Sequence, residues 1–233
     1  MQTEPARPGR AEERDGSRRR RQRNARGHGS RLTEDIVSAA LVLIERTGTD
    51  EAVTLRAVAR EVGIAAPSIY AHFADREAIV MAVVVRIFDE LTAAIEAGVK
   101  SAGDDPVDRL LAGCDAYVSF GLAKPARYNV LFTERRIVSV ADYYRPTQIG
   151  PGGRPVLEFG AESFALLVDA IEECVEAGLS ASTDVVADGT AVWVALHGAI
   201  SLRSALPAFP WPEPGQFVRQ LVLPLAKVTK PAG

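Results

Sequence analysis

Cysteine and histidine are scarce in this chain, and their placement argues against several kinds of site. The 233 residues include two cysteines, Cys114 and Cys174, and three histidines. The cysteines form no Cys-x-x-Cys pair, and the histidines are too scattered along the chain to suggest a zinc site. We therefore expect two buried free thiols and no bound metal.

Long apolar runs and catalytic motifs are also missing. No uninterrupted apolar run reaches the roughly 20 residues that span a bilayer, and the Arg-rich start is not followed by the apolar core of a secretory signal. The chain contains no Gly-rich phosphate loop, no nucleophile elbow and no cluster of metal ligands. The sequence therefore predicts a cytoplasmic protein with no membrane partner, which is not an enzyme and needs no cofactor.

Charge is distributed unevenly between the start of the chain and the rest. Residues 1–31 hold ten arginines and four acidic residues, a net charge of +6, whereas the remainder carries 17 basic and 26 acidic residues, a net charge of −9. A basic tail on an acidic body predicts that the tail meets a polyanion. Residues 1–29 have almost no large apolar side chains, so we expect a disordered basic arm. The arm is either a solvated tail without a role or a contact to DNA phosphates or the minor groove.

The apolar residues recur at helical spacing, and no stretch alternates as a strand does. This pattern predicts an all-α fold with a small head at residues 30–79 and a larger helical body at residues 80–230. The expected helices begin at Thr33, Thr54 and Ala66 in the head and then cover Asp75 to Ala102, Pro106 to Ala123, Pro125 to Phe132, Arg154 to Ala177, Asp184 to Leu206 and Gly215 to Val228.

The stretch from Thr54 to Arg76 is the most informative part of the chain. Thr54 can cap a first short helix, and Gly63 can end it in a left-handed conformation. A second helix starts near Pro67, where the missing N–H is not needed. Ile69 and Phe73 lie four residues apart and can pack inward, which leaves the other side chains exposed. This pattern is typical of a helix-turn-helix, which places its second helix in the DNA major groove.

Residues from about Arg31 to Ile79 resemble the DNA-binding domain of the TetR (tetracycline-repressor-like) family of bacterial transcription regulators. A second match, Trp193-x-x-x-His197-Gly198, resembles the Trp-His-Gly subfamily of C-terminal domains. The first resemblance rests on an apolar first helix ending in Gly48, then Thr54-Leu55-Arg56, Ala59, Val62-Gly63-Ile64, Ser68-Ile69-Tyr70, His72-Phe73 and Asp75-Arg76-Glu77.

The resemblance implies a DNA-binding head joined by a long helix to a ligand-binding and dimerisation body. It implies a repressor that binds a palindromic double-stranded DNA operator as a homodimer and is released by a small-molecule effector. The implied dimer interface uses the helices Arg154–Ala177 and Asp184–Leu206, the second of which is rich in small residues.

The family motif also implies individual DNA contacts. The candidates for phosphate contact are Thr54, Tyr70, His72 and Arg76, and the candidates for the base edges are Arg56, Pro67, Ser68 and Ala71. The Arg56 guanidinium can fork onto a guanine, and Pro67 and Ala71 can touch a thymine methyl. Each phosphate candidate also has a purely structural interpretation. Tyr70 can pack over the first helix, His72 can cap or stack locally, and Arg76 can be a solvated helix charge.

Aromatic residues gather in the body and predict an apolar cavity for a small molecule. Trp193 and His197 lie four residues apart and therefore share one helix face. His197 is either a polar point of the cavity or a core histidine with satisfied hydrogen bonds. The expected lining residues are Tyr117, Phe120, Tyr128, Phe132, Phe164, Trp193 and His197.

An architectural or sequence-tolerant DNA-binding protein remains the alternative function. Such a protein would use the Arg-rich arm rather than the helix-turn-helix. Its DNA binding would survive Tyr70→Ala and Ser68→Ala and would fail when residues 1–30 are removed. A ligand-responsive regulator predicts the opposite result.

Overall fold

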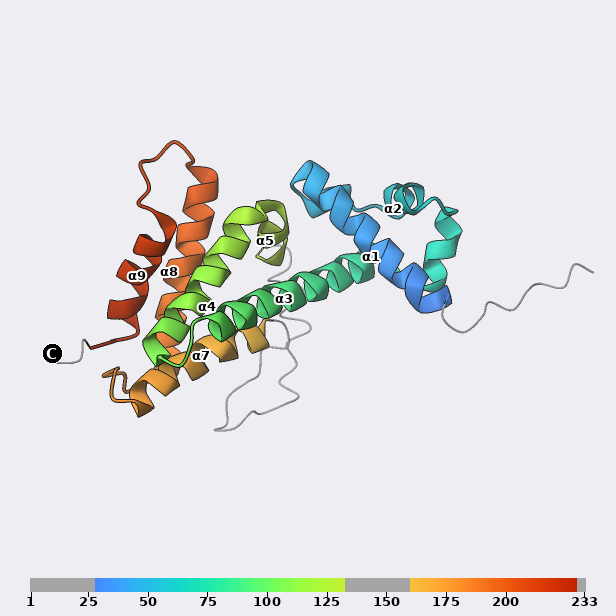
Figure 1. Cartoon of the computed structure of the whole chain (residues 1–233). Helices are drawn as coiled ribbons and strands as arrows, with labels where there is room; N and C mark the ends of the chain where they lie inside the picture. Colours follow the sequence, from blue (N-terminus) through green and yellow to red (C-terminus); the bar gives the residue numbers. More distant parts are fainter. Residues whose placement is uncertain (1–27, 133–159, 230–233) are drawn as a thin grey trace, which may run out of the picture.

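The computed structural model describes residues 28–132 and 160–229, and this part of the chain is helical (Figure 1). Within these ranges the only extended pairing is an isolated bridge between Ser180 and Val228. The predicted all-α class is confirmed. The helices are α1 (His28–Thr47), η1 (Asp50–Ala52), α2 (Leu55–Val62), η2 (Ala66–Ala71), α3 (Arg76–Ser101), α4 (Pro106–Ala123), α5 (Pro125–Leu131), α7 (Ala161–Glu176), α8 (Val185–Ala205) and α9 (Pro214–Leu225).

The head consists of α1, α2, η2 and the start of α3. The Thr54 hydroxyl accepts a bond from the Ala57 amide at 3.1 Å and caps α2. Gly63 ends α2 at a φ of +79°, a conformation that a side chain would disfavour. Ile69 is fully buried and Phe73 nearly so, as predicted.

Two boundaries in the head differ from the sequence prediction. Helix α1 begins at His28 rather than Thr33, so the last two residues of the expected disordered arm are helical. Leu32 packs against the core, which stabilises the added turn. The segment that presents the exposed side chains is a six-residue 3-10 helix, η2, and it ends before Phe73. Bonds from the Ser68 and His72 amides to carbonyls three residues earlier give η2 this tighter winding.

Helix α3 connects the head to the body (Figure 1). The Asp75 carboxylate caps it by accepting from the Ala78 amide at 2.8 Å, as the sequence predicts. Its 26 residues extend about 39 Å at the helical rise of 1.5 Å per residue. Its buried residues run from Ile79 in the head to Ile95 in the body, so one helix contributes to both cores.

Helix α4 lies at the centre of the body and contacts α3, α5, α7, α8 and α9. Gly121 allows α4 to approach α8, because a Cβ there would lie 2.8 Å from the Ile200 side chain. By length and composition alone, helix α8 could cross a membrane. One such helix is weak evidence for a membrane span, because a core helix of a soluble protein passes the same test. It packs against α4, α7 and α9 on its buried side.

Candidate nucleic-acid interface and internal cavity

The outer side of η2 is open to solvent. Pro67, Ser68, Tyr70 and Ala71 are all exposed, and 61% of Tyr70 is accessible. Ile69, between Ser68 and Tyr70, is fully buried and anchors the segment to the head. The interpretation in which Tyr70 packs over α1 is therefore not supported. A short rigid segment with four exposed side chains can enter a DNA groove without unfolding any part of the head.

Thr54 and Arg56 at the start of α2 are exposed. The Thr54 oxygen accepts the capping bond, and its hydroxyl hydrogen can still be donated to a phosphate. His72 is half-buried, and its Nδ1 lies 3.0 Å from the Thr33 hydroxyl of α1. This bond gives His72 a structural role in joining η2 to α1.

Arg76 is held by the head itself. Its Nη2 donates to the Asp50 carbonyl at 2.6 Å and to the Asp50 carboxylate at 2.9 Å, and its Nη1 pairs with Glu77. These bonds tie the start of α3 to η1, across 26 residues of sequence. A phosphate contact by Arg76 would have to compete with Asp50. The sequence does not predict this pairing, because Asp50 belongs to the three-residue η1, which is too short to show helical periodicity.

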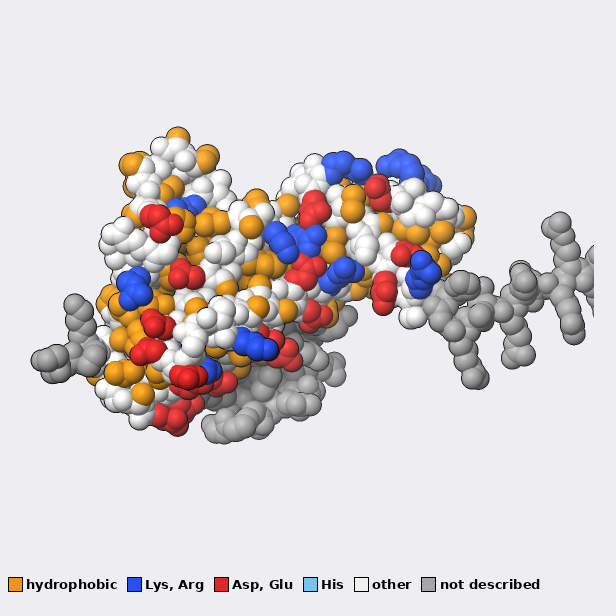
Figure 2. Space-filling view, in the orientation of Figure 1, with side chains coloured by type: hydrophobic (Ala, Val, Ile, Leu, Met, Phe, Trp, Pro, Cys, Tyr) orange, Lys and Arg blue, Asp and Glu red, His pale blue; other side chains and the backbone are white. Residues whose placement is uncertain are grey.

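Basic side chains gather on one edge of the head, although the head carries acidic side chains as well. In the view of Figure 2, Lys and Arg side chains gather along the upper edge of the head, while acidic side chains are concentrated on the lower part of the body. The exposed basic residues of the head include Arg46, Arg56 and Arg60. This basic edge of the head is locally favourable for a duplex, whereas the acidic part of the body is not.

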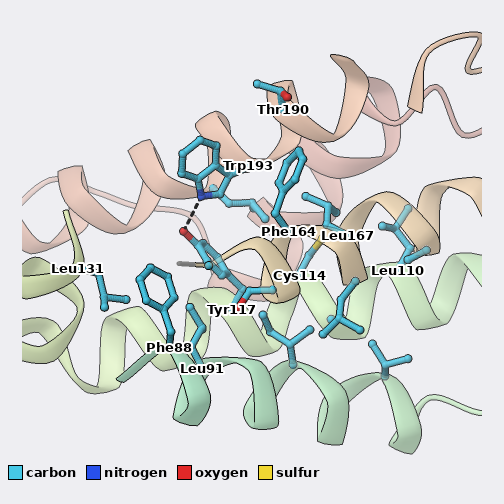
Figure 3. Close-up of a pocket in the computed structure, with 18 of the residues that line it drawn as sticks. Phe88, Leu91, Leu110, Cys114, Tyr117, Leu131, Phe164, Leu167, Thr190 and Trp193 are labelled. Carbon is cyan, nitrogen blue, oxygen red and sulfur yellow. Dashed lines mark hydrogen bonds between the residues drawn. The ribbon is translucent and has the colours of Figure 1, made fainter. Parts of the chain in front are cut away.

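A cavity of about 740 Å³ lies inside the body, between α3, α4, α5, α7 and α8 (Figure 3). Apolar side chains dominate its walls. Four of the predicted lining residues, Tyr117, Phe132, Phe164 and Trp193, do line it. Among the residues that the structure describes, no three His, Cys, Asp or Glu side chains gather as metal ligands. The chemistry of the walls suits an apolar organic molecule rather than a metal or a phosphate-rich cofactor.

Three predicted lining residues lie outside the described cavity wall. Phe120 is buried elsewhere, with the Lys124 ammonium 4.9 Å from its ring centroid. Tyr128 and His197 lie behind Tyr117 in a hydrogen-bonded chain. An aromatic side chain at helical spacing serves the core and a cavity equally well, so the sequence pattern did not separate the two groups.

The hydrogen-bonded chain runs from the cavity wall into the core. The indole N–H of Trp193 donates to the Tyr117 hydroxyl at 3.1 Å, which lies 2.7 Å from the Tyr128 hydroxyl, and Tyr128 is 2.8 Å from Nδ1 of His197. Burial lowers the pKa of His197 and so favours the neutral imidazole, whose Nδ1 can accept from Tyr128. Burial also raises the pKa of Tyr117 to about 12. His197 is therefore a half-buried histidine whose ring nitrogens have partners in Tyr128 and Ser201.

Helix α3 supplies a second stripe of lining residues that sequence reasoning missed. Met81, Val84, Phe88, Leu91 and Val99 face the cavity at intervals of three or four residues or their multiples. The spacing is visible in the sequence, but aliphatic residues at helical spacing are equally typical of a packed core, so the pattern does not mark them as cavity lining. Cys114 also lines the cavity, and burial raises the pKa of its thiol to about 12, so the thiol stays protonated.

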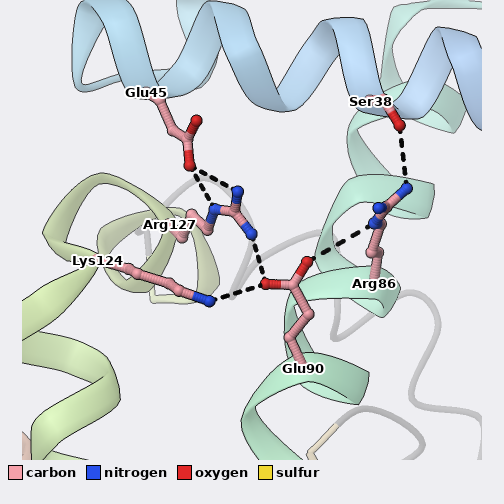
Figure 4. A network of polar contacts seen from close by, with 6 residues as sticks. All are labelled: Ser38, Glu45, Arg86, Glu90, Lys124 and Arg127. Atoms are coloured by element: carbon pink, nitrogen blue, oxygen red, sulfur yellow. Dashed lines mark hydrogen bonds and ion pairs between the residues drawn. The ribbon is translucent and has the colours of Figure 1, made fainter.

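An ionic network connects the head to the body next to the cavity (Figure 4). Arg127 of α5 donates to Glu45 of α1 at 2.6 Å and pairs with Glu90 of α3. Arg86 also joins the two parts, because it bonds Ser38 of α1 at 3.1 Å and lies 3.6 Å from Glu90. Burial alone would raise the pKa of Glu90, but Arg127 and Lys124 outweigh burial and lower it. We call Glu45, Arg86, Glu90, Lys124 and Arg127 the junction network.

Comparison with known proteins matches both parts of the chain. Residues 36–83 match the family model described as bacterial regulatory proteins, tetR family. Residues 110–223 match the model described as tetracyclin repressor-like, C-terminal domain. The head match covers α2 and η2, and the second match covers most of the body.

Individual relatives agree with these matches. The uncharacterized HTH-type transcriptional regulator Rv0681 of Mycobacterium tuberculosis is 35% identical over 97 residues, which are 41% of this chain and 43% of that protein. The alignment thus spans less than half the length of that relative. A protein of unknown function from Rhodococcus sp. RHA1 has a TM-score of 0.67 at 26% identity, over 88% of this chain and 97% of its own.

The TetR family transcriptional regulator PfmR of Thermus thermophilus has a TM-score of 0.55 at 20% identity, over 84% of this chain and 98% of its own. At that identity the likeness concerns the fold. It covers head and body together, in the same order along the chain.

Proposed function

Because this chain belongs to the TetR family of DNA-binding transcriptional regulators, we propose that it represses transcription as a homodimer on a palindromic operator. A small molecule that occupies the body cavity releases the operator. One observation carries the proposal most directly. The exposed side of η2 and the wall of the cavity are joined by the single helix α3.

Contacts to DNA divide by chemistry. Tyr70, Thr54 and the half-buried His72 offer donors to phosphates, and these contacts place the head on the duplex. Arg56 and Ser68 can hydrogen-bond to base edges, while Pro67 and Ala71 supply apolar contact. Because η2 carries few polar side chains, Arg56 contributes much of the base discrimination.

The dimer forms through α8 and the adjoining face of α7. Small and apolar residues of α8 recur at helical spacing on its exposed side: Ala187, Ala191, Val194, Gly198, Leu202 and Ala205. Val194 and Leu202 are 58% and 51% exposed, and a Cβ at Gly198 would meet nothing within 4 Å. This stripe lets a second α8 approach closely. Exposed side chains of α7 such as Glu162, Asp169 and Glu172 form the polar rim.

Two routes carry an effector signal from the cavity to the head. Helix α3 lines the cavity at Phe88 and enters the head core at Ile79. Helix α5 lines the cavity at Leu131, and its Arg127 binds Glu45 of α1. A ligand that moves α5 or α3 therefore changes the angle of the head, and the two heads of the dimer no longer match the two half-sites.

The alternative role, general DNA coating by the Arg-rich arm, concerns residues that lie mostly outside the described ranges. The exposed outer side of η2 favours the regulator. The protein acts in the cytoplasm, where its DNA target lies, and catalyses no reaction in this proposal.

Selection of bound sequences from random duplexes tests the proposal. We expect one enriched motif with two inverted half-sites one helical turn, about 34–36 Å, apart. Compounds are then screened for release of that duplex. Enrichment of no motif at moderate salt, or binding lost only when residues 1–30 are removed, would support the coating protein instead.

Replacing Arg127 by glutamine should weaken the signal from cavity to head. The change removes the bonds to Glu45 and Glu90 while both helices remain packed. We define the release factor as the ratio of operator affinity without the compound to operator affinity with it. Allosteric coupling typically changes affinity by about 5- to 150-fold, and we expect the release factor of a compound from the screen to fall several-fold in this variant. The measurement is operator affinity with and without the compound.

The control for that experiment is Lys124→Gln. Lys124 lies 3.3 Å from Glu90 and has no bond to α1 among those the structure gives it, so it contributes to the network without reaching the head. Lys124→Gln should leave the release factor near the wild-type value. Equal release factors for Arg127→Gln and wild type would show that α3 alone carries the signal.

A further inference from the structure

The body cavity is long and has apolar walls. Its lining runs along α3 from Met81 to Val99, a separation of about 27 Å at 1.5 Å per residue. Figure 3 shows Leu131 and Phe88 at one end and Leu110 at the other. A volume of about 740 Å³ spread over this length fits an extended molecule better than a compact one.

Arg109 is the only charged side chain among the described residues that line the cavity. It lies in the first turn of α4, close to the Val99 end of α3, because α3 and α4 are joined by a short turn. This is the end of the cavity away from the head. Phe88 and Leu131 lie at the opposite end (Figure 3), and Met81, near the start of α3, also lines the cavity.

The Arg109 guanidinium has a donor left over. The Arg109 side chain is 35% exposed and its Nη2 donates to Glu173 at 3.2 Å, but its Nε–H is buried and meets no acceptor among the described residues. The hydroxyls of the wall have partners: Ser163 bonds Thr92 at 2.6 Å, Thr190 bonds a backbone carbonyl, and Tyr117 bonds Tyr128. A buried donor without an acceptor is costly, and a ligand acceptor at Nε would remove that cost.

From these observations we infer that the effector is a linear amphiphile with one carboxylate, a long-chain fatty acid, bound with its carboxylate at Arg109 and its tail directed toward Phe88 and Phe132. The inference rests on the proposed function and names the chemical class that the cavity takes. A single carboxylate matches the single guanidinium, part of whose charge is already taken by Glu173. A phosphate dianion would be left with too little positive charge around it.

The tail explains how binding reaches the head. A long chain fills the end of the cavity formed by Phe88 of α3, Leu131 at the end of α5 and Phe132, which follows α5. A short chain occupies only the Arg109 end and does not press on α5. Affinity therefore rises by about fourfold for each CH₂ group that enters the apolar channel, and release of DNA requires the longer chains.

The test measures binding directly, without DNA, on the full chain freed of lipid. Trp193 lies in the wall and Trp211 lies elsewhere, so the Trp211→Phe background makes fluorescence a report from the cavity. Hexadecanoate and its methyl ester are titrated below their aggregation concentrations. Because a hydrogen bond to a charged group is strong, we expect hexadecanoate to bind about 10- to 100-fold more tightly than the ester.

Two variants assign that preference to Arg109. Arg109→Gln should remove it while leaving ester binding unchanged. Glu173→Gln should strengthen hexadecanoate binding, because the competing carboxylate, which is 42% exposed at its side chain, is neutralised. A merely structural role for the ion pair would make both variants weaken binding. No quenching of Trp193, equal affinity for acid and ester, or hexadecanoate binding unchanged in Arg109→Gln would each overturn the inference.

Operator binding, measured separately, distinguishes the two levels of the proposal. If other compounds release the operator but hexadecanoate does not bind, the regulator function stands and this ligand class is wrong. If hexadecanoate binds as described and operator affinity does not change, the ligand class stands and release by cavity occupancy is wrong.

Discussion

Replacing Tyr70 by alanine should lower operator affinity of the dimer by about 100- to 10 000-fold. A hydrogen bond from Tyr70 to a phosphate is charge-assisted, and such bonds contribute about 1.5–3 kcal/mol. The dimer loses the contact twice, once in each half-site. The side chain is 61% exposed, so the melting temperature should stay close to that of the wild type. Equilibrium binding to the selected operator, at one stated salt concentration, measures the effect.

Two neighbouring substitutions separate the components of that loss. Tyr70→Phe removes only the hydroxyl, and it should account for most of the loss if the phosphate bond dominates. Ser68→Ala lies on the same exposed side, but a base contact should relax sequence preference rather than weaken all DNA equally. Wild-type operator affinity in Tyr70→Ala would show that η2 does not meet DNA.

Replacing Val194 by glutamate should convert the dimer to monomers and reduce operator affinity by at least about 100-fold. Val194 is 58% exposed in the single chain, in the small-residue stripe of α8. In the dimer it would be covered by the partner, and an unpaired carboxylate there costs several kcal/mol. Each head then binds its half-site independently. The second head no longer gains the high effective concentration that the dimer gives it. Sedimentation equilibrium gives the mass, and titration gives the affinity.

The matched control adds the same charge elsewhere. Gln220→Glu changes an exposed residue of α9 and should leave both mass and operator affinity unchanged. If Val194→Glu remains a dimer with full operator affinity, the interface lies on another surface, and the exposed apolar residues Leu206 and Phe209 become the next candidates.

Helices and their ends were the most predictable part of the fold. Local signals settle them: Asp75 and Asp184 accept bonds from backbone amides at the starts of α3 and α8, and the predicted span of α4, Pro106 to Ala123, matches the structure. Proline starts and carboxylate caps act within one helical turn, so helix ends marked in this way can be located from the sequence alone.

Contacts between distant residues were the least predictable part. Arg76 was expected at a phosphate and pairs with Asp50, and Arg127 binds Glu45 across 82 residues of sequence. The spacing of charged surface residues along the sequence does not identify which residue each one will pair with. Tyr128 and His197 were expected in the cavity wall but lie behind it, because only the relative rotation of α4, α5 and α8 decides which side of a helix meets empty space.

The continuity of α3 constrains how relatives of this protein can diversify. Helix α3 contributes Ile79 to the head core and Phe88 and Leu91 to the cavity wall. A substitution in α3 that reshapes the cavity also changes the orientation of η2. A change in ligand preference through α3 therefore disturbs DNA binding. New effector preferences should therefore arise first through changes in α7 and α8, and comparison of related chains should find the inward positions of α3 the slowest to vary.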